Sequence, residues 1–166
     1  MYRVLFHLVL LLTTCSVHAQ NGSSYLKHGR YTFPETGLSL QAPEHFDTTY
    51  MYKGLLHKAT SSSLVSTKAG DRNPIAFNLS MTKDYFNTQN LTLIKSEKLT
   101  TPNWQGILYY LSFDIKNVKM QRMMLVTGTY NDTYIVMANF PDMFSSQLIV
   151  PIRESLLTLL LNPNAK

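Results

Sequence analysis

The 166-residue sequence contains a single cysteine, Cys15, which lies close to the N-terminus. No cysteine follows, so disulfides, thiol catalysis and cysteine-ligated metal sites are excluded for residues 20–166. The seven glycines are isolated from one another, and no glycine-rich loop can be built to cradle a phosphate. These absences remove several common classes of enzyme.

Catalytic and metal-binding motifs are also missing. No Gly-x-Ser-x-Gly elbow occurs, and His28, His45 and His57 lack the short spacings that bind metals. Glu44-His45-Phe46-Asp47 brings ligand-type side chains together, but a loop histidine beside a carboxylate is usually a surface pair. We therefore expect no cofactor and no metal.

The charge pattern argues against nucleic acid as a partner. The chain has a net charge of +5, yet charged residues make up only 15% of it and the lysines are scattered, without a run of Lys or Arg. A nucleic-acid-binding face needs its positive charge concentrated in one place. We expect no nucleic-acid partner.

Residues 1–19 have the order of a secretory signal peptide. Arg3 supplies positive charge, Val4–Leu12 is almost entirely apolar, and Val17 and Ala19 are suited to a leader peptidase. The apolar run is much shorter than the roughly 20 residues that span a bilayer. We predict cleavage between Ala19 and Gln20, and a secreted or periplasmic protein.

Cys15 leaves an alternative open. Leu12-Thr13-Thr14-Cys15 resembles a lipoprotein box, in which the leader is cut before a cysteine that then carries lipid. Thr14 fits this pattern poorly, because a smaller residue normally precedes the cysteine. Contact with a membrane is expected only if Cys15 is lipidated.

The rest of the chain is predicted to form one domain. Residues 20–30 read as a short polar segment, and residues 31–162 as a single α+β domain of a size that supports one core. Apolar residues make up 45% of the chain, and the ten tyrosines and eight phenylalanines favour sheet.

Alternating apolar and polar residues predict most of the strands. A hairpin joins Tyr31–Phe33 to Leu38–Leu40 through a turn at Pro34–Gly37. An antiparallel meander follows later, with turns at Lys116-Asn117 and Asn131-Asp132. The predicted strands after the hairpin are Leu55–Ala59, Ser63–Ala69, Ile75–Met81, Thr92–Leu99, Gly106–Ile115, Val118–Thr127 and Thr133–Phe140.

Two helices are predicted. Thr82 is a good N-cap, Asp84 lies in the first turn, and the helix is expected to end near Gln89. Near the C-terminus, leucines and isoleucines recur every three or four residues between Leu148 and Leu160. This amphipathic helix is expected to begin near Pro151, stop at Pro163 and pack on the sheet.

Three aromatic residues are the candidate partner-binding residues. Trp104 lies in a turn at the rim of the sheet, where a lone tryptophan can anchor a partner or close the edge of the core. Tyr109 and Tyr110 lie on a strand and could stack on a ligand, although packing in the sheet explains them as well.

The sequence resembles PsbP-like domains over residues 31–162. The resemblance lies in Phe33-x-x-x-Gly37-Leu38-x-Leu40-x-x-Pro43-x-x-Phe46, in the helix after Met81, in Gly106-Ile107-Leu108-Tyr109, in the meander, and in the final helix Ile152–Leu160. It implies an antiparallel sheet flanked by helices, an α/β/α sandwich, and a binding or assembly role without catalysis. It places no ligand-binding residue.

We therefore expect an exported, non-catalytic binding or assembly domain with a protein partner in the envelope or outside the cell. Two alternatives stay open. One is a small secreted hydrolase or lyase with a dispersed site, which convergent reactive groups in a pocket would favour. The other is a carrier of a small apolar ligand, which an apolar cavity between sheet and helix would favour.

Overall fold

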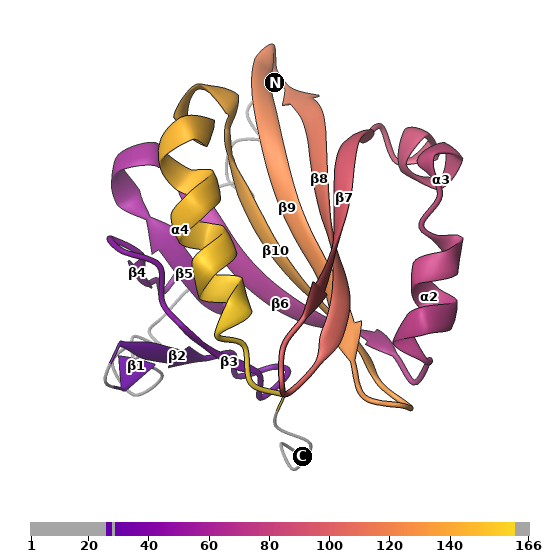
Figure 1. Cartoon of the computed structure of the whole chain (residues 1–166). Helices are drawn as coiled ribbons and strands as arrows, with labels where there is room; N and C mark the ends of the chain where they lie inside the picture. Colours follow the sequence, from indigo (N-terminus) through magenta and orange to yellow (C-terminus); the bar gives the residue numbers. More distant parts are fainter. Residues whose placement is uncertain (1–25, 28, 162–166) are drawn as a thin grey trace, which may run out of the picture.

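The computed structural model describes residues 26–27 and 29–161 (Figure 1). A seven-stranded antiparallel sheet, in the order β4-β5-β6-β10-β9-β8-β7, forms the centre, and a small sheet β1-β2-β3 lies at one end. The strands are β1 (Leu26–Lys27), β2 (Arg30–Thr32), β3 (Ser39–Gln41), β4 (Asp47–Thr48), β5 (Gly54–His57), β6 (Ser62–Gly70), β7 (Thr92–Thr100), β8 (Gln105–Ile115), β9 (Val118–Gly128) and β10 (Thr133–Pro141). The helices are α2 (Pro74–Ser80), α3 (Lys83–Thr88) and α4 (Ser145–Leu157), with 3-10 turns η2 (Lys58–Thr60) and η3 (Asp142–Phe144).

The opening hairpin forms as predicted. Strands β2 and β3 pair antiparallel, with Tyr31 opposite Leu40. Gly37 has a φ of 69°, a left-handed conformation that glycine adopts without steric cost, and its N–H donates to the carbonyl of Phe33. The turn at Pro34–Gly37 is therefore closed by a left-handed glycine.

The meander of β8, β9 and β10 is also confirmed. Lys116 and Asn117 both have positive φ values, 47° and 67°, as a two-residue hairpin turn requires. Strand β7 pairs with β8 at one edge, and β6 pairs with β10 on the other side of the meander. Strand β6 was predicted nearly to its ends, whereas β5 stops at His57 and the chain then turns through η2.

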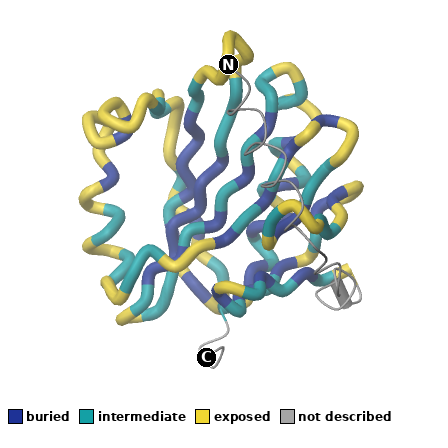
Figure 2. The backbone as a smooth tube through the Cα atoms, turned by 180° about the vertical axis from the view of Figure 1, so that it is seen from behind, coloured by how far each residue is buried: buried dark blue, intermediate teal, exposed yellow. Residues whose placement is uncertain are grey.

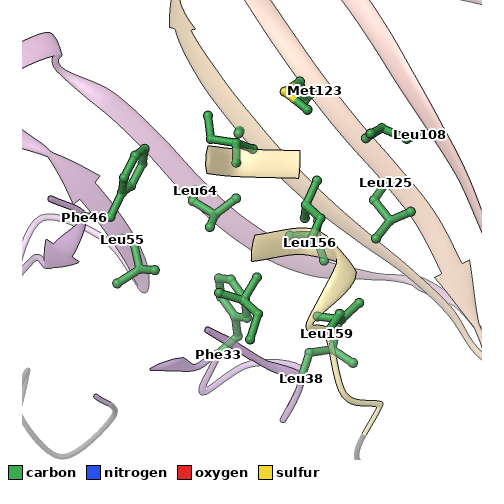
Figure 3. Packing of buried hydrophobic residues seen from close by; sticks show 14 of the residues in the cluster. Phe33, Leu38, Phe46, Leu55, Leu64, Leu108, Met123, Leu125, Leu156 and Leu159 are labelled. Atoms are coloured by element: carbon green, nitrogen blue, oxygen red, sulfur yellow. The ribbon is translucent and has the colours of Figure 1, made fainter. Parts of the chain in front are cut away.

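The larger core lies between the sheet and α4. It includes every second residue of β10, namely Tyr134, Val136, Ala138 and Phe140, on the face predicted from the sequence. Helix α4 contributes Leu148, Ile152 and Leu156, and the opening hairpin closes one end with Phe33 and Leu38. In Figure 3, Leu156 lies beside the strand residues Leu64 and Leu125.

A second core lies on the opposite face of the sheet, beneath α2 and α3. Phe86 of α3 packs there with Tyr109 and Leu111 of β8 and Val126 of β9. Figure 2 shows the buried middle of the sheet and, beside it, the largely exposed α2–α3 segment. The sheet is therefore covered by helices on both faces. The fold is α+β, an antiparallel sheet flanked by helices, as predicted.

Helix α2 corrects one prediction. Residues Ile75–Met81 were expected to form a half-buried strand, but Pro74–Ser80 is helical. Asn73 caps the helix, since its Oδ1 accepts a hydrogen bond of 2.8 Å from the N–H of Ile75, and Pro74 occupies the first turn, where its missing N–H costs nothing.

The same apolar residues satisfy both periods in this short window. Phe77 and Met81, four residues apart, face the sheet, whereas Ile75 and Leu79, also four apart, are 72% and 77% exposed. In a window this short, the same apolar spacing is therefore compatible with an alternating strand and with a helix that carries apolar residues on two sides.

Helix α4 corrects a second prediction. It begins at Ser145 and ends at Leu157, so Pro151 lies inside it rather than in its first turn. Proline removes one backbone hydrogen bond from the helix interior. Leu148 and Ile152 flank Pro151 and are both buried against the sheet, and this packing offsets the loss. Beyond the helix, Leu160 forms a bridge with Ser39.

The N-terminal predictions lie outside the described residues. The signal peptide, cleavage between Ala19 and Gln20, and lipidation of Cys15 therefore stay predictions, as do the domain bounds drawn from them. Within the described ranges, no helix is long and apolar enough to cross a membrane.

Candidate functional site

A hollow of about 420 Å³ lies between the α2–α3 segment and the sheet. Phe77, Met81 and Phe86 line it from the helical side, and Met124, Ile135 and Met137 line it from β9 and β10. Its volume falls in the range of about 300–1,000 Å³ that is typical of small-ligand pockets. Methionine side chains are flexible and polarizable, so this wall can adapt to an apolar ligand.

The helical wall has a capping hydrogen bond within α3 and a hydrogen bond from α2 to the sheet. The hydroxyl of Thr82 accepts a hydrogen bond of 3.1 Å from the N–H of Tyr85 and so caps α3, as predicted. The hydroxyl of Tyr109, on the sheet, donates to Oδ1 of Asn78 in α2 at 2.9 Å. Its ring also lies 5.2 Å from that of Phe86, so one tyrosine positions both helices.

Among the described residues that line the hollow, Arg122 is the one cation, and it lies in the sheet wall. It lies on β9, opposite Leu111 of β8 and Asn139 of β10. Its Nε donates to Oδ1 of Asn139 at 2.7 Å, and its guanidinium lies 5.1 Å from the centre of the Phe113 ring. Burial lowers the pKa of Arg122 below its ordinary value, although an arginine keeps its charge at neutral pH.

The Arg122 guanidinium has no carboxylate partner within the described part of the chain. Asp114 also borders the hollow, but it alternates with Phe113 along β8, so its side chain points to the other face of the sheet. A half-buried positive charge without a counter-ion is costly to desolvate.

A second hollow of about 340 Å³ lies against the other side of α2. Ile75 and Leu79 line it from the helix, and Lys98, Gly106 and Ile107 line it from β7 and β8. The two α2 side chains are mostly exposed, so they form an apolar surface beside the edge of the sheet.

The structure places Trp104 in the core. It lies in the turn between β7 and β8, as predicted, but its side chain is only 5% exposed. Its Nε1–H donates a hydrogen bond of 2.9 Å to the carbonyl of Leu159. In this position the indole closes the edge of the core, which is the second of the two interpretations of Trp104, and partner binding by this residue stays a prediction.

Tyr109 and Tyr110 are buried as well, on opposite faces of the sheet. Tyr109 holds the α2–α3 segment. The hydroxyl of Tyr110 donates to Glu97 at 3.2 Å, beneath Lys95, whose Nζ lies 4.3 Å from the ring centre. Their contacts are internal, so neither offers a surface on which a partner could stack.

The histidine segment is a surface feature. The Nε2 atom of His45 lies 3.4 Å from a carboxylate oxygen of Glu44, and both side chains are exposed. His57 bonds through Nδ1 to the hydroxyl of Thr60 at 2.7 Å, and that hydroxyl bonds to Ser62 at 2.6 Å. Neither hollow is lined by these residues, and no group of three or more His, Cys, Asp or Glu that could hold a metal occurs among the described residues.

Sequence reasoning missed Arg122, although a signal was present. Within the predicted strand Val118–Thr127, Met120, Arg122, Met124 and Val126 share one face by alternation. A cation in the middle of an apolar face is the informative exception. The hollow itself had no signal, because the segment that forms its other wall was expected to be a strand.

Comparison with solved structures gives several likenesses. PsbP (CyanoP) from Synechocystis sp. PCC 6803 is 10% identical, with a TM-score of 0.52 over 80% of this chain and 91% of the other. LpqN, involved in cell envelope biogenesis of Mycobacterium tuberculosis, is 13% identical, with a TM-score of 0.52 over 88% of each chain. PA94, a Pseudomonas aeruginosa protein of unknown function, is 10% identical, with a TM-score of 0.53 over 72% of this chain and 97% of the other.

The fold is PsbP-like. At these identities the likeness concerns the fold alone, because a PsbP-like fold can carry different functions in different proteins. No family model matches the sequence, and comparison with curated proteins gives no match. The function of this PsbP-like domain therefore depends on its own residues.

Proposed function

We propose that this protein is an exported, non-catalytic binding domain of the cell envelope or extracellular space. The observation that carries the proposal is the hollow between α2–α3 and the sheet. Most of the side chains that line it are apolar, and Arg122 is the one cation among the described residues of its lining. An apolar pocket with few polar groups is typical of a ligand-binding site. The leader-like residues 1–19 support export.

The lining of the hollow favours binding over catalysis. General acid–base or nucleophilic chemistry needs a base within hydrogen-bond reach of the reacting group. The hydroxyl of Tyr85 and the amides of Gln89 and Asn90 border the hollow, and no histidine, serine or lysine is among the described residues that line it. Asp114 is the one carboxylate in this lining, and strand alternation directs its side chain to the other face of the sheet. A secreted hydrolase or lyase therefore finds less support than a carrier of a small ligand.

Binding in the hollow can be tested with Nile red, a neutral dye whose emission shifts to the blue and intensifies in apolar surroundings. We expect the protein expressed from its full sequence to bind the dye saturably. Ile135→Trp should weaken binding about tenfold or more, because an indole at Ile135 fills the space between β10 and the helices.

Thr67→Trp is the matched control. Thr67 pairs with Ile135 on the neighbouring strand and shares its face of the sheet, but it is exposed and does not line the hollow. This variant should bind Nile red as the wild type does. Absence of saturable binding, or equal loss in both variants, would argue against a ligand site at this position.

The surface of Ile75 and Leu79 favours a second candidate, a protein partner docked on α2. Apolar side chains this exposed and this close together often mark an interaction site. This candidate keeps the expectation of an envelope or extracellular protein partner and moves its contact site from Trp104 to α2.

A further inference from the structure

The sheet wall of the hollow combines features that specify a ligand class. Apolar side chains from both walls make up most of the lining, and Arg122 and Phe113 lie toward one end of the same sheet face. A ligand with an apolar body and one negatively charged end matches this distribution of side chains. A wholly apolar ligand would leave the guanidinium without a counter-ion.

The Arg122 guanidinium is held in a fixed orientation while part of it stays free. Its Nε is occupied by Asn139, and its plane lies near the Phe113 ring. Its two terminal nitrogens make no hydrogen bond to the residues that the structure describes. Two parallel N–H donors of this kind suit the paired oxygens of a carboxylate or phosphate.

We propose that the hollow binds a single-chain amphiphile whose alkyl chain lies between α2–α3 and the methionines of the sheet, and whose anionic head group is bound by Arg122. The inference rests on the proposed function and names its ligand class. The volume lies near the lower end of the range for small-ligand pockets, which favours one alkyl chain.

Calorimetric titration with four probes that share a ten-carbon chain tests the inference. They are decanoate, decyl phosphate, decan-1-ol and decyltrimethylammonium, each used below its aggregation or solubility limit. We expect an anionic probe to bind at least tenfold more tightly than the alcohol or the cation, because charge-assisted hydrogen bonds are about twice as strong as neutral ones. The two anions distinguish a carboxylate from a phosphate head group.

Arg122→Gln should abolish this preference. Glutamine keeps a donor for Asn139 but has no charge, so binding of the anion should fall about tenfold or more while decan-1-ol binds as before. Arg122→Lys should restore part of the difference. Arg72→Gln is the matched control, since Arg72 is an exposed arginine that lies outside the hollow.

The outcomes separate the inference from the proposed function. Equal binding of all four probes by the wild type, or an unchanged anion preference in Arg122→Gln, overturns the inference and leaves the binding domain standing. Failure of Nile red and of every probe overturns both. The wild-type probe series needs no variant, so it decides the matter even if Arg122→Gln does not fold. Capture of a peptide or protein in the hollow without alkyl binding also overturns the inference.

Discussion

The guanidinium of Arg153 on α4 binds the carboxylate of Glu97 on the edge strand β7 through two nitrogens. The Nε atom lies 3.3 Å from Oε2, and Nη2 contacts Oε1. Tyr110 donates its hydroxyl to the same carboxylate from the neighbouring strand. Both charged side chains are about one-third exposed, 36% for Arg153 and 33% for Glu97. The pair fixes the free edge of the sheet to the helix that covers the larger core.

Glu97 should make stability depend on pH. Arg153, followed by Tyr110 and Lys95, holds the pKa of Glu97 below its ordinary value, although burial acts in the opposite direction. A carboxyl whose pKa is lower in the folded state stabilises the protein above its unfolded pKa, near 4.3, and loses that contribution as pH falls through the folded pKa.

At pH 7 we expect the free energy of unfolding of Glu97→Gln to be lower than that of the wild type by about 1 kcal/mol, a value that includes solvent screening. The variant should therefore unfold at a lower denaturant concentration. The difference should shrink as the pH falls below about 4, where the unfolded carboxyl becomes protonated first. Denaturant unfolding of both proteins at each pH measures it. Glu35→Gln, which removes a more exposed ion pair with Lys53, should have little effect on stability at pH 7. A difference that stays constant down to pH 2 would contradict this account.

Trp104 should contribute strongly to stability. Trp104→Ala removes a buried indole and leaves the carbonyl of Leu159 without its donor, so we expect a loss of about 3–5 kcal/mol. Trp104→Phe should cost less, since it keeps most of the packing. Tyr130→Ala, at an exposed aromatic residue, should change stability by less than about 0.5 kcal/mol. Chemical denaturation checks all three, and a Trp104→Ala loss as small as that of Tyr130→Ala would show that the indole is not packed as described.

Tyr109 should control the mobility of the hollow's helical wall. Tyr109→Phe removes the hydrogen bond to Asn78, and we expect faster amide hydrogen exchange in α2 and a global cost of about 1 kcal/mol. Tyr110→Phe is the matched control: it removes a similar hydroxyl on the other face and should leave exchange in α2 unchanged. Equal exchange in the two variants would show that Tyr109 does not hold the helix.

The apolar surface of α2 should matter for a protein partner and not for stability. We expect Ile75→Ser with Leu79→Ser to lose a partner that the wild type captures from its native envelope, while stability changes by less than about 0.5 kcal/mol per substitution, because both side chains are exposed. Val150→Ser, at an exposed apolar residue of α4, should retain the partner. Recovery of the same partner by the double variant would place the interaction elsewhere.

Local sequence patterns determined the elements that have one apolar and one polar face, and the turns that need particular residues. The hairpin at Gly37, the turn at Lys116-Asn117, the cap at Thr82 and the buried face of β10 were all readable, because backbone preference and side-chain alternation act within a few residues. The PsbP-like fold was expected from the resemblance to that family, which these elements carry in part.

Tertiary contacts decided the rest. Pro74–Ser80 is a helix because Asn73 caps it and Phe77 packs on a distant sheet, although its apolar spacing also suits a strand. Trp104 is buried because the chain 55 residues later brings the carbonyl of Leu159 to its indole. The hollow beside Arg122 likewise depends on strands and helices that meet only after folding. Sequence alone determined how each segment prefers to fold, and the packing of distant segments decided which side chains were buried and where a ligand could enter.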